Sequence, residues 1–374
     1  MNMIRLSQII APELVAAAKE RLDVCTNVVI VTHMSPDGDA MGSSLAMRHY
    51  LEDQGKHVTV VVPNKFPEFL AWLPKANEDM IYEAQKEAAD QVLEVADLVI
   101  CTDFNEPKRI GSLGDKVQSL ACPKIMIDHH LHPSDLADVV VSYPKSPSTC
   151  ELVYRLMMDL AAMGNPRIET LPSRLEIATC IYTGMMTDTG NFSFNSNYAE
   201  MYQIVGQLVE LGVDKDKIYN AVFNAYSADR MRLMGYCLYN KMRIFPEYHT
   251  ALIYLSKKEL YRFNFQSGDA EGIVNLPLQI KDIHYSCFMR EDKVNPTEVE
   301  LANGSKTKIK ISLRSQGDRP VNTFAHDIFG GGGHANASGG EYYGPLPEAV
   351  QQFLDNYQRY FNKELTGTQA CSRA

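Results

Sequence analysis

The sequence predicts an α/β protein, with an N-terminal doubly wound, mostly parallel β-sheet domain and a smaller C-terminal α/β domain. Runs of Val, Ile and Leu alternate with helix-like segments between residues 28 and 195, as in βαβ units. After residue 242, apolar and polar residues alternate, which is typical of strands in a half-covered sheet. A chain of 374 residues also exceeds what one hydrophobic core usually supports, so two domains are expected.

The elements of the N-terminal domain follow in order along the chain. Strands are expected at residues 28–33, 57–63, 98–103, 124–130 and 139–143, with helices at 40–54 and about 80–96. Right-handed crossovers should connect these parallel strands. Two further helices are expected to start with capping boxes, at Ser148 with Glu151 and at Ser173 with Glu176. The second helix runs through residues 175–186 and presents Asp188 just past its end.

The remaining elements belong to a connection and to the second domain. Residues 199–242 have a helical pattern that Gly212 interrupts. Strands are then expected at 251–256, 284–290 and 308–315, and helices near Leu276, at 321–329 and at 346–361. The expected division is a catalytic domain at 1–197, a helical linker at 198–242, a substrate-binding domain at 243–365 and a flexible tail at 366–374.

Composition excludes several classes of function. The net charge of −10 argues against a protein that coats long or duplex nucleic acid through a basic surface. The eight cysteines form no C-x-x-C pair, and most lie in apolar runs where cysteine behaves as a small hydrophobic residue. The sequence has neither a signal peptide nor an apolar stretch long enough to span a membrane, so we expect a cytoplasmic protein without a membrane partner.

The first chemical constellation follows the strand at residues 28–33. His33, Asp37 and Asp39 lie between this strand and the next helix, and Pro36 and Gly38 force a tight turn. Carboxylates with one imidazole suit a hard or borderline ion such as Mn²⁺ or Mg²⁺. The alternative is a turn rich in aspartate in which Asp39 is the N-cap of the helix.

Three other segments carry aspartate or histidine at the end of a predicted strand or helix. Asp103 ends its strand, and the Asp128-His129-His130 run ends the strand at 124–130. Because strand side chains alternate, Asp128 and His130 should face one side and His129 the other. In open α/β sheets, ligands gather beyond the carboxyl ends of the strands. Together with Asp188, these segments predict a pair of divalent metals about 3.5–4 Å apart and a phosphoester hydrolase.

A second constellation lies downstream, in the run from Gly330 to His334. Glycines allow the backbone to approach a ligand, and their N–H groups can bind an anion. The backbone amides of Gly331, Gly332 and Gly333 and the side chain of His334 are therefore candidates for phosphate binding, although a plain flexible linker is the alternative. Arg314 is a candidate to donate two hydrogen bonds to the same phosphate, and Arg109 is a weaker candidate for this role. The alternative is that both arginines are solvated surface residues.

The order of these residues resembles the DHH phosphoesterases with the DHH-associated C-terminal domain. The match runs from His33-x-x-x-Asp37-x-Asp39 through Asp103, Asp128-His129-His130 and Asp188 to Arg314 and GGGGH, nearly the whole chain. Spacing and size are most similar to the branch of nanoRNases and pAp phosphatases, which degrade very short oligoribonucleotides and dephosphorylate 3′-phosphoadenosine 5′-phosphate.

The resemblance implies a role for each matched residue. It makes His33, Asp37 and Asp103 ligands of one metal and Asp39, Asp103, His129 and Asp188 ligands of the other, so that Asp103 bridges the two ions. Asp128 supports the ligands, and His130 contacts the scissile phosphate or the leaving group. Arg314, His334 and the Gly331 to Gly333 amides form a substrate clamp, so the active site is expected in a cleft between the two domains. Arg109 fits the family pattern only loosely.

The expected function is therefore hydrolysis of short oligoribonucleotides to mononucleotides, removal of the 3′-phosphate of 3′-phosphoadenosine 5′-phosphate, or both, by a hydroxide between two metals, most readily Mn²⁺. A linear or cyclic dinucleotide phosphodiesterase, a RecJ-like single-strand exonuclease and a pyrophosphatase are enzymatic alternatives. A nucleotide-sensing or RNA-binding module without turnover is the non-enzymatic one. Oligomeric state stays open, with a homodimer as one option.

Overall fold

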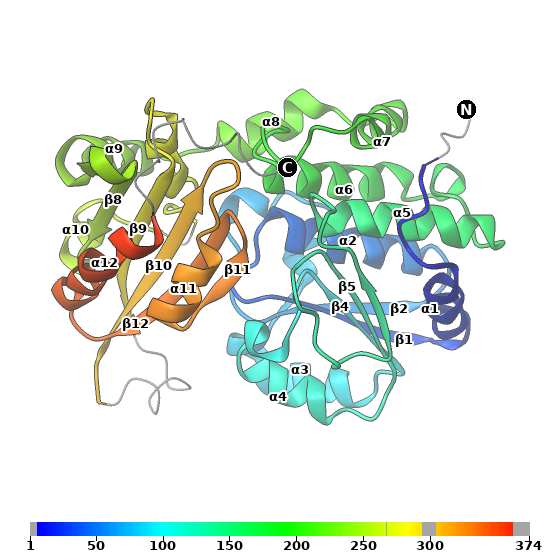
Figure 1. Cartoon of the computed structure of the whole chain (residues 1–374). Coiled ribbons are helices and arrows are strands. Elements are labelled where there is room, and N and C mark those ends of the chain that lie inside the picture. Colours follow the sequence, from blue (N-terminus) through cyan, green and yellow to red (C-terminus); the bar gives the residue numbers. More distant parts are fainter. Residues whose placement is uncertain (1–5, 267, 294–303, 362–374) are drawn as a thin grey trace, which may run out of the picture. The chain divides into compact units, whose positions relative to one another are not determined.

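The computed structural model describes residues 6–266, 268–293 and 304–361, and these form two compact units (Figure 1). The first unit ends at Ala225 and the second begins at Tyr226, within the segment 198–242 that was expected to be a linker. The predicted tail at 366–374 lies outside the described residues.

The first unit is built on a six-stranded parallel sheet in the order β3-β2-β1-β4-β5-β6. Its strands are β1 (Asn27–Thr32), β2 (His57–Val62), β3 (Met80–Ile81), β4 (Leu98–Thr102), β5 (Lys124–Asp128) and β6 (Val139–Ser142). The strand order reverses between β1 and β4, as in doubly wound folds, whose ligands bind at that point. The predicted mostly parallel sheet is confirmed.

Helices cover both faces of this sheet (Figure 1). On one face lie α1 (Pro12–Val24), α2 (Gly38–Glu52), α5 (Thr149–Ala162) and α6 (Arg174–Asp188), and on the other lie α3 (Tyr82–Glu94) and α4 (Ser112–Ser119). The unit ends with α7 (Ala199–Glu210) and α8 (Lys215–Phe223). Each face of the sheet packs against its helices in a separate hydrophobic core. Strand β1 contributes to both, because Val28 and Ile30 point into one core and Val29 and Val31 into the other.

The second unit contains a mixed six-stranded sheet in the order β11-β12-β10-β9-β8-β7. Its strands are β7 (Arg243–Phe245), β8 (Thr250–Leu255), β9 (Tyr285–Lys293), β10 (Thr307–Ser315), β11 (Gly332–His334) and β12 (Ala337–Tyr343). Only β8 and β9 pair in parallel among these described strands. The unit also contains α9 (Ala228–Tyr236), α10 (Lys257–Arg262), α11 (Asn322–Phe329) and α12 (Leu346–Tyr360).

Some local predictions were wrong. Ser173 makes no capping hydrogen bond, because its hydroxyl bonds to Asp53 instead. Ser148 does cap α5, but Glu151 does not return the bond, since its carboxylate pairs with Arg155 and Tyr198.

Three other elements differ from the expectation. The helix expected near Leu276 is a 3-10 helix, Ile273–Gln279, and the helix expected from residue 80 begins only after β3. Half of the glycine run is not a loop, because Gly332–His334 forms β11 against β12. No helix among the described residues combines the length and hydrophobicity needed to cross a bilayer.

Candidate metal centre

The acidic and imidazole side chains gather beyond the carboxyl ends of three adjacent strands. His33 follows β1, Asp103 follows β4, and His129 follows β5. Two helices complete the set, since Asp39 lies in the first turn of α2 and Asp188 is the last residue of α6. Gly38 allows these two helix ends to approach, because a Cβ there would lie 2.3 Å from the Thr187 hydroxyl.

The first group of ligand atoms comes from His33, Asp37 and Asp103. The Nε2 of His33 lies 3.3 Å from Oδ2 of Asp103 and 3.8 Å from Oδ2 of Asp37. Its Nδ1 lies 2.9 Å from the carbonyl oxygen of Met34, which can only accept a hydrogen bond. The proton of a neutral His33 is therefore on Nδ1, and the Nε2 lone pair faces the two carboxylates.

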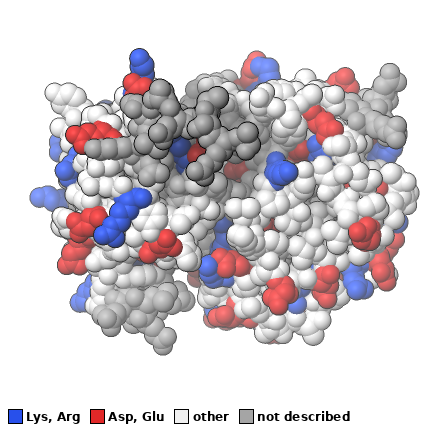
Figure 2. Space-filling view, in the orientation of Figure 1, with Lys and Arg blue, Asp and Glu red and all other residues white. Residues whose placement is uncertain are grey.

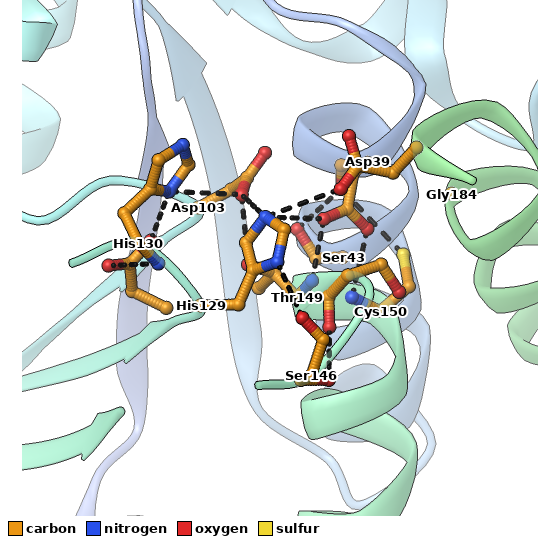
Figure 3. A network of polar contacts seen from close by, with 12 residues as sticks. Asp39, Ser43, Asp103, His129, His130, Ser146, Thr149, Cys150 and Gly184 are labelled. Atoms are coloured by element: carbon orange, nitrogen blue, oxygen red, sulfur yellow. Dashed lines mark hydrogen bonds and ion pairs between the residues drawn. The ribbon is translucent and has the colours of Figure 1, made fainter. Parts of the chain in front are cut away.

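The second group comes from Asp39, His129 and Asp188, of which Figure 3 labels Asp39 and His129. The Nε2 of His129 lies 3.3 Å from Oδ2 of Asp188 and 3.9 Å from Oδ2 of Asp39. Its Nδ1 lies 3.1 Å from the Ser146 carbonyl oxygen, so this imidazole is oriented in the same way as His33. Each group can offer its ligand atoms to one cation.

Asp103 lies between the two groups. Its Oδ2 faces His33, and its Oδ1 lies 3.6 Å from Nε2 of His129. The residue is 2% exposed and adopts a left-handed backbone with φ of +65°, which aspartate tolerates better than most residues. Strain of this kind collects at functional sites. The carboxylate thus faces both groups of candidate ligand atoms.

Asp39 is held by the first turn of α5. The backbone N–H groups of Thr149 and Cys150 donate to its two carboxylate oxygens, at 2.6 and 2.9 Å. These are donors that a helix start leaves without intrahelical partners. The Thr149 hydroxyl donates to Oδ1 of Asp103 at 2.9 Å, so one residue positions both acids.

His130 lies on the other side of Asp103 from Asp39 (Figure 3), and Asp128 holds its ring. The Nδ1 of His130 lies 2.7 Å from Oδ1 of Asp128, and its backbone N–H donates to Oδ2 at 3.0 Å. His129 and His130 thus diverge, as strand alternation predicts. Arg109 lies in the 3-10 helix Pro107–Ile110, and its charge adds to burial in holding the pKa of His130 well below its usual value.

The electrostatics of the site favour a cation. Burial alone would lower the pKa of His33 and of His129, but the neighbouring carboxylates outweigh it and raise these pKa values to about 10 and about 9. Burial and the charges of Asp103 and Asp188 raise the pKa of Asp39 well above its usual value. Several carboxylates in one buried place repel one another unless a positive charge compensates them. Oxygen donors with two imidazoles fit divalent cations.

The second unit places two of the predicted phosphate-binding side chains in one row. Arg314 on β10 and His334 on β11 both pair with Ala337 of β12. Residues opposite one another across strands share a face, so the two half-buried side chains flank a small alanine. The predicted amide cradle needs one correction, since the Gly331 N–H donates to the Ala325 carbonyl and is not free for an anion.

Comparison with known proteins now identifies the family. Residues 27–185 match the N-terminal domain of the DHH family, and residues 253–363 match the DHHA1 domain. A crystal structure of an exopolyphosphatase-related protein from Bacteroides fragilis is 45% identical, with a TM-score of 0.83, over 95% of this chain and 98% of that chain. The chain belongs to the DHH family. The predicted resemblance is confirmed.

Curated members of the DHH family are also similar over most of their length. The bifunctional oligoribonuclease and PAP phosphatase NrnA of Thermus thermophilus is 28% identical, over 88% of each chain. The protein of the same name from Bacillus subtilis is 22% identical, over 84% of this chain and 89% of its own. The expectation of a hydrolytic enzyme of the DHH family agrees with these relatives.

Several positioning residues of this DHH domain were not predicted. They are Ser146, Thr149, Cys150 and Gly184. A Cβ at Gly184 would lie 2.2 Å from the Cys150 sulfur and 2.8 Å from Oδ1 of Asp39, so α6 can approach the acid only with glycine there. One signal was present, because Ser148 marks a helix start, whose first N–H groups need acceptors. The local pattern does not identify Asp39 as the acceptor, because Asp39 lies 110 residues before Thr149 in the sequence.

Proposed function

We propose that this protein hydrolyses short oligoribonucleotides to mononucleotides and removes the 3′-phosphate of 3′-phosphoadenosine 5′-phosphate. The names of the curated relatives from Thermus thermophilus and Bacillus subtilis support this pair of activities. The observation that carries the proposal is Asp103, whose two oxygens face two separate histidine and acid groups. A carboxylate in this position suits phosphoester chemistry with two cations.

The proposal includes two divalent ions, Mn²⁺ in preference to Mg²⁺. His33, Asp37 and Asp103 would hold one ion, and the other would be held by Asp39, Asp103, His129 and Asp188. Imidazole donors favour Mn²⁺ over the harder Mg²⁺. When bound, such ions supply Lewis acidity toward the phosphate and lower the pKa of an attacking water.

The chain's own residues would orient and protonate the substrate. Asp128 fixes the ring of His130, and we assign His130 to the scissile phosphate or the leaving oxygen. A departing oxygen needs a proton, but burial and the charge of Arg109 hold the pKa of His130 well below its usual value, so this ring would carry that proton only with the negative charge of the bound phosphate beside it. Arg109, whose charge acts on His130, would add a fork of donors for the same phosphate.

The second unit would hold a phosphate of the substrate. Arg314 and His334 flank Ala337, and this small side chain leaves space for an anion over the row. Gly332 and Gly333 lie on β11, an edge strand whose outer backbone groups have no neighbouring strand among the described residues. We therefore propose that these groups of the second unit bind a phosphate, with Gly331 left out of the backbone donors.

The charge distribution supports a small substrate. Over the described residues visible in Figure 2, acidic and basic side chains are interspersed, and the basic ones do not gather into an extended surface. A processive exonuclease would benefit from such a surface along the strand it tracks. Short oligonucleotides need only the few donors of a local phosphate site.

Polyphosphate hydrolysis is a second candidate. The 45% identical protein of known structure from Bacteroides fragilis is described as exopolyphosphatase-related. Initial rates on short oligoribonucleotides, 3′-phosphoadenosine 5′-phosphate, pyrophosphate and polyphosphate, each with Mn²⁺, Mg²⁺ or no metal, separate the candidates. We expect the two nucleotide substrates with Mn²⁺ to be the fastest. Turnover confined to pyrophosphate or polyphosphate would contradict the nucleotide proposal.

The Asp103→Asn variant tests the shared carboxylate. Asparagine has the same shape and tolerates the left-handed backbone, so the fold should survive while the ligand charge is lost. We expect kcat/KM for 3′-phosphoadenosine 5′-phosphate to fall by more than about 100-fold, beyond what residues that only support ligands usually cost. Asp216→Asn is the matched control, since the Asp216 side chain is 79% exposed on α8. Activity of Asp103→Asn near that of the control would refute the role of Asp103.

A further inference from the structure

The loop that follows Asp188 has an unusual backbone. Residues 189–198 connect α6 to α7 and include Gly190, Asn191, Phe192 and Asn195 at positive φ, between +51° and +59°. Three of these four residues are not glycine, and for Phe192 this conformation costs about 1–2 kcal/mol, whereas the two asparagines tolerate it better. Interactions around the loop must offset that cost, and the loop begins directly after a predicted metal ligand.

Buried Thr189 supplies many of these interactions. Its hydroxyl donates to the Met185 carbonyl at 2.6 Å and accepts from the Phe192 N–H at 3.0 Å. Its own carbonyl accepts from the N–H groups of Ser193 and Phe194, at 2.9 and 3.1 Å. The backbone of Phe194 is therefore tied to the end of α6, the helix that carries Asp188.

The two phenylalanines of this loop have different surroundings. Phe192 packs against Tyr182 in an edge contact with ring centroids 5.6 Å apart, and it belongs to the border of the core. Phe194 is 48% exposed. Its ring lies against Gly190, where an added Cβ would come within 2.2 Å of the ring. A large aromatic side chain is thus held in a defined position six residues beyond the predicted metal ligand Asp188, with about half of its surface in solvent.

Polar residues flank Phe194 in the sequence. Asn191, Ser193 and Asn195 are exposed, and their side chains make no hydrogen bond to another described residue. Amides and hydroxyls of this kind can pair with the edges of a nucleobase whose face lies on an aromatic ring. The loop combines a fixed aromatic surface with uncommitted donors and acceptors.

We propose that Phe194 is the residue on which a nucleobase of the substrate stacks beside the metal centre. The inference rests on the proposed nucleotide function and adds a specificity determinant to it. Stacking is tolerant of sequence because every base has a π-face, which suits an enzyme that degrades short RNA of any sequence. It also discriminates nucleotides from pyrophosphate and polyphosphate, which carry phosphate without a base.

The test compares substrates with and without bases. In Phe194→Ala, the KM for a diribonucleotide and for 3′-phosphoadenosine 5′-phosphate should rise about 5- to 150-fold, the range expected for losing one base–aromatic stack, with kcat little changed. A dinucleotide backbone that lacks both bases should be hydrolysed at the rate of the unaltered protein. Phe194→Tyr and Phe194→Trp should restore the KM, because both retain a ring for stacking. Tyr202→Ala is the control, since Tyr202 is 52% exposed on α7.

Two results would overturn the inference. One is an equal loss on the abasic and base-containing substrates, which would mean that Phe194 supports the position of Asp188. The other is an unchanged KM for nucleotides in Phe194→Ala. If the unaltered protein hydrolyses no nucleotide, the proposed function fails and the stacking role with it. If nucleotides are hydrolysed by both proteins with the same KM, only the stacking role fails.

Discussion

At the scale of single residues, Thr149 contacts two acids of the candidate metal centre. Its backbone N–H bonds to Asp39 and its hydroxyl to Asp103. In Thr149→Val the shape and the backbone donor remain, but the hydroxyl is lost. We expect metal affinity or kcat/KM to fall about 10- to 100-fold, as for other residues that orient ligands. Thr149→Ser keeps the hydroxyl and should behave like the unaltered protein. Equal metal affinity in the Val and Ser variants, measured by calorimetric titration, would exclude this positioning role.

The histidine ligands predict how metal binding depends on pH. Carboxylates overcome burial and raise the pKa of His33 to about 10 and that of His129 to about 9, so both rings carry an extra proton at pH 7 in the metal-free protein. A metal must displace these protons, and its apparent affinity should therefore rise with pH up to about 9 to 10. Titration calorimetry in buffers of different ionisation enthalpy should detect proton release at pH 7. Affinity that is constant between pH 6 and pH 9, without proton release, would contradict this assignment.

At the scale of elements, the approach of α6 to α2 and α5 depends on small residues. In Gly184→Ala, the new methyl group would meet the Cys150 sulfur and the Asp39 carboxylate. We expect the free energy of unfolding to fall by about 1–3 kcal/mol, the usual cost of overpacking, together with a loss of activity. Gly206→Ala is the matched control in α7, because a Cβ there meets no atom within 4 Å. This control should gain up to about 1 kcal/mol from helix propensity. Urea unfolding of both variants makes the comparison, and a stable, active Gly184→Ala would refute the packing argument.

Hydrophobic periodicity predicts some features of the helices and strands but not others. The buried strands β1, β4 and β5 were predicted because each is a continuous apolar run that ends in acid or imidazole. The capping box at Ser173 failed because Asp53, far away in sequence, competes for the same hydroxyl. The alternative in which Asp39 is the N-cap is wrong, because the N-cap is Asp37, which accepts from the N–H groups of Asp39 and Ala40, and the Asp39 carboxylate faces the candidate metal centre. Local motifs specify a helix start but not which neighbouring polar group occupies it.

At the scale of the whole molecule, all predicted metal ligands belong to the first unit, whereas Arg314 and His334 belong to the second. Each unit has hydrophobic clusters of its own. Chelation should therefore stop turnover and lower the melting temperature of the first unit alone. At a free metal concentration of 100 times Kd, bound metal should stabilise the folded state by about 2.7 kcal/mol per site. Differential scanning calorimetry with Mn²⁺ and with a chelator tests this. A shift of every transition, or of none, would contradict a centre confined to the first unit.

The amino-acid sequence is enough to predict the doubly wound sheet, the strand ends that carry His33, Asp103 and His129, and the family to which the chain belongs. These features follow from periodicity and from residue type at short range. The folded chain is needed to see that Asp103 faces both histidines, that the start of α5 holds Asp39, and that Ala337 lies in one row with Arg314 and His334. The physical reason is that such contacts arise where distant segments pack together. Hydrophobic periodicity specifies which face of an element is buried, but not which polar atoms meet across that packing.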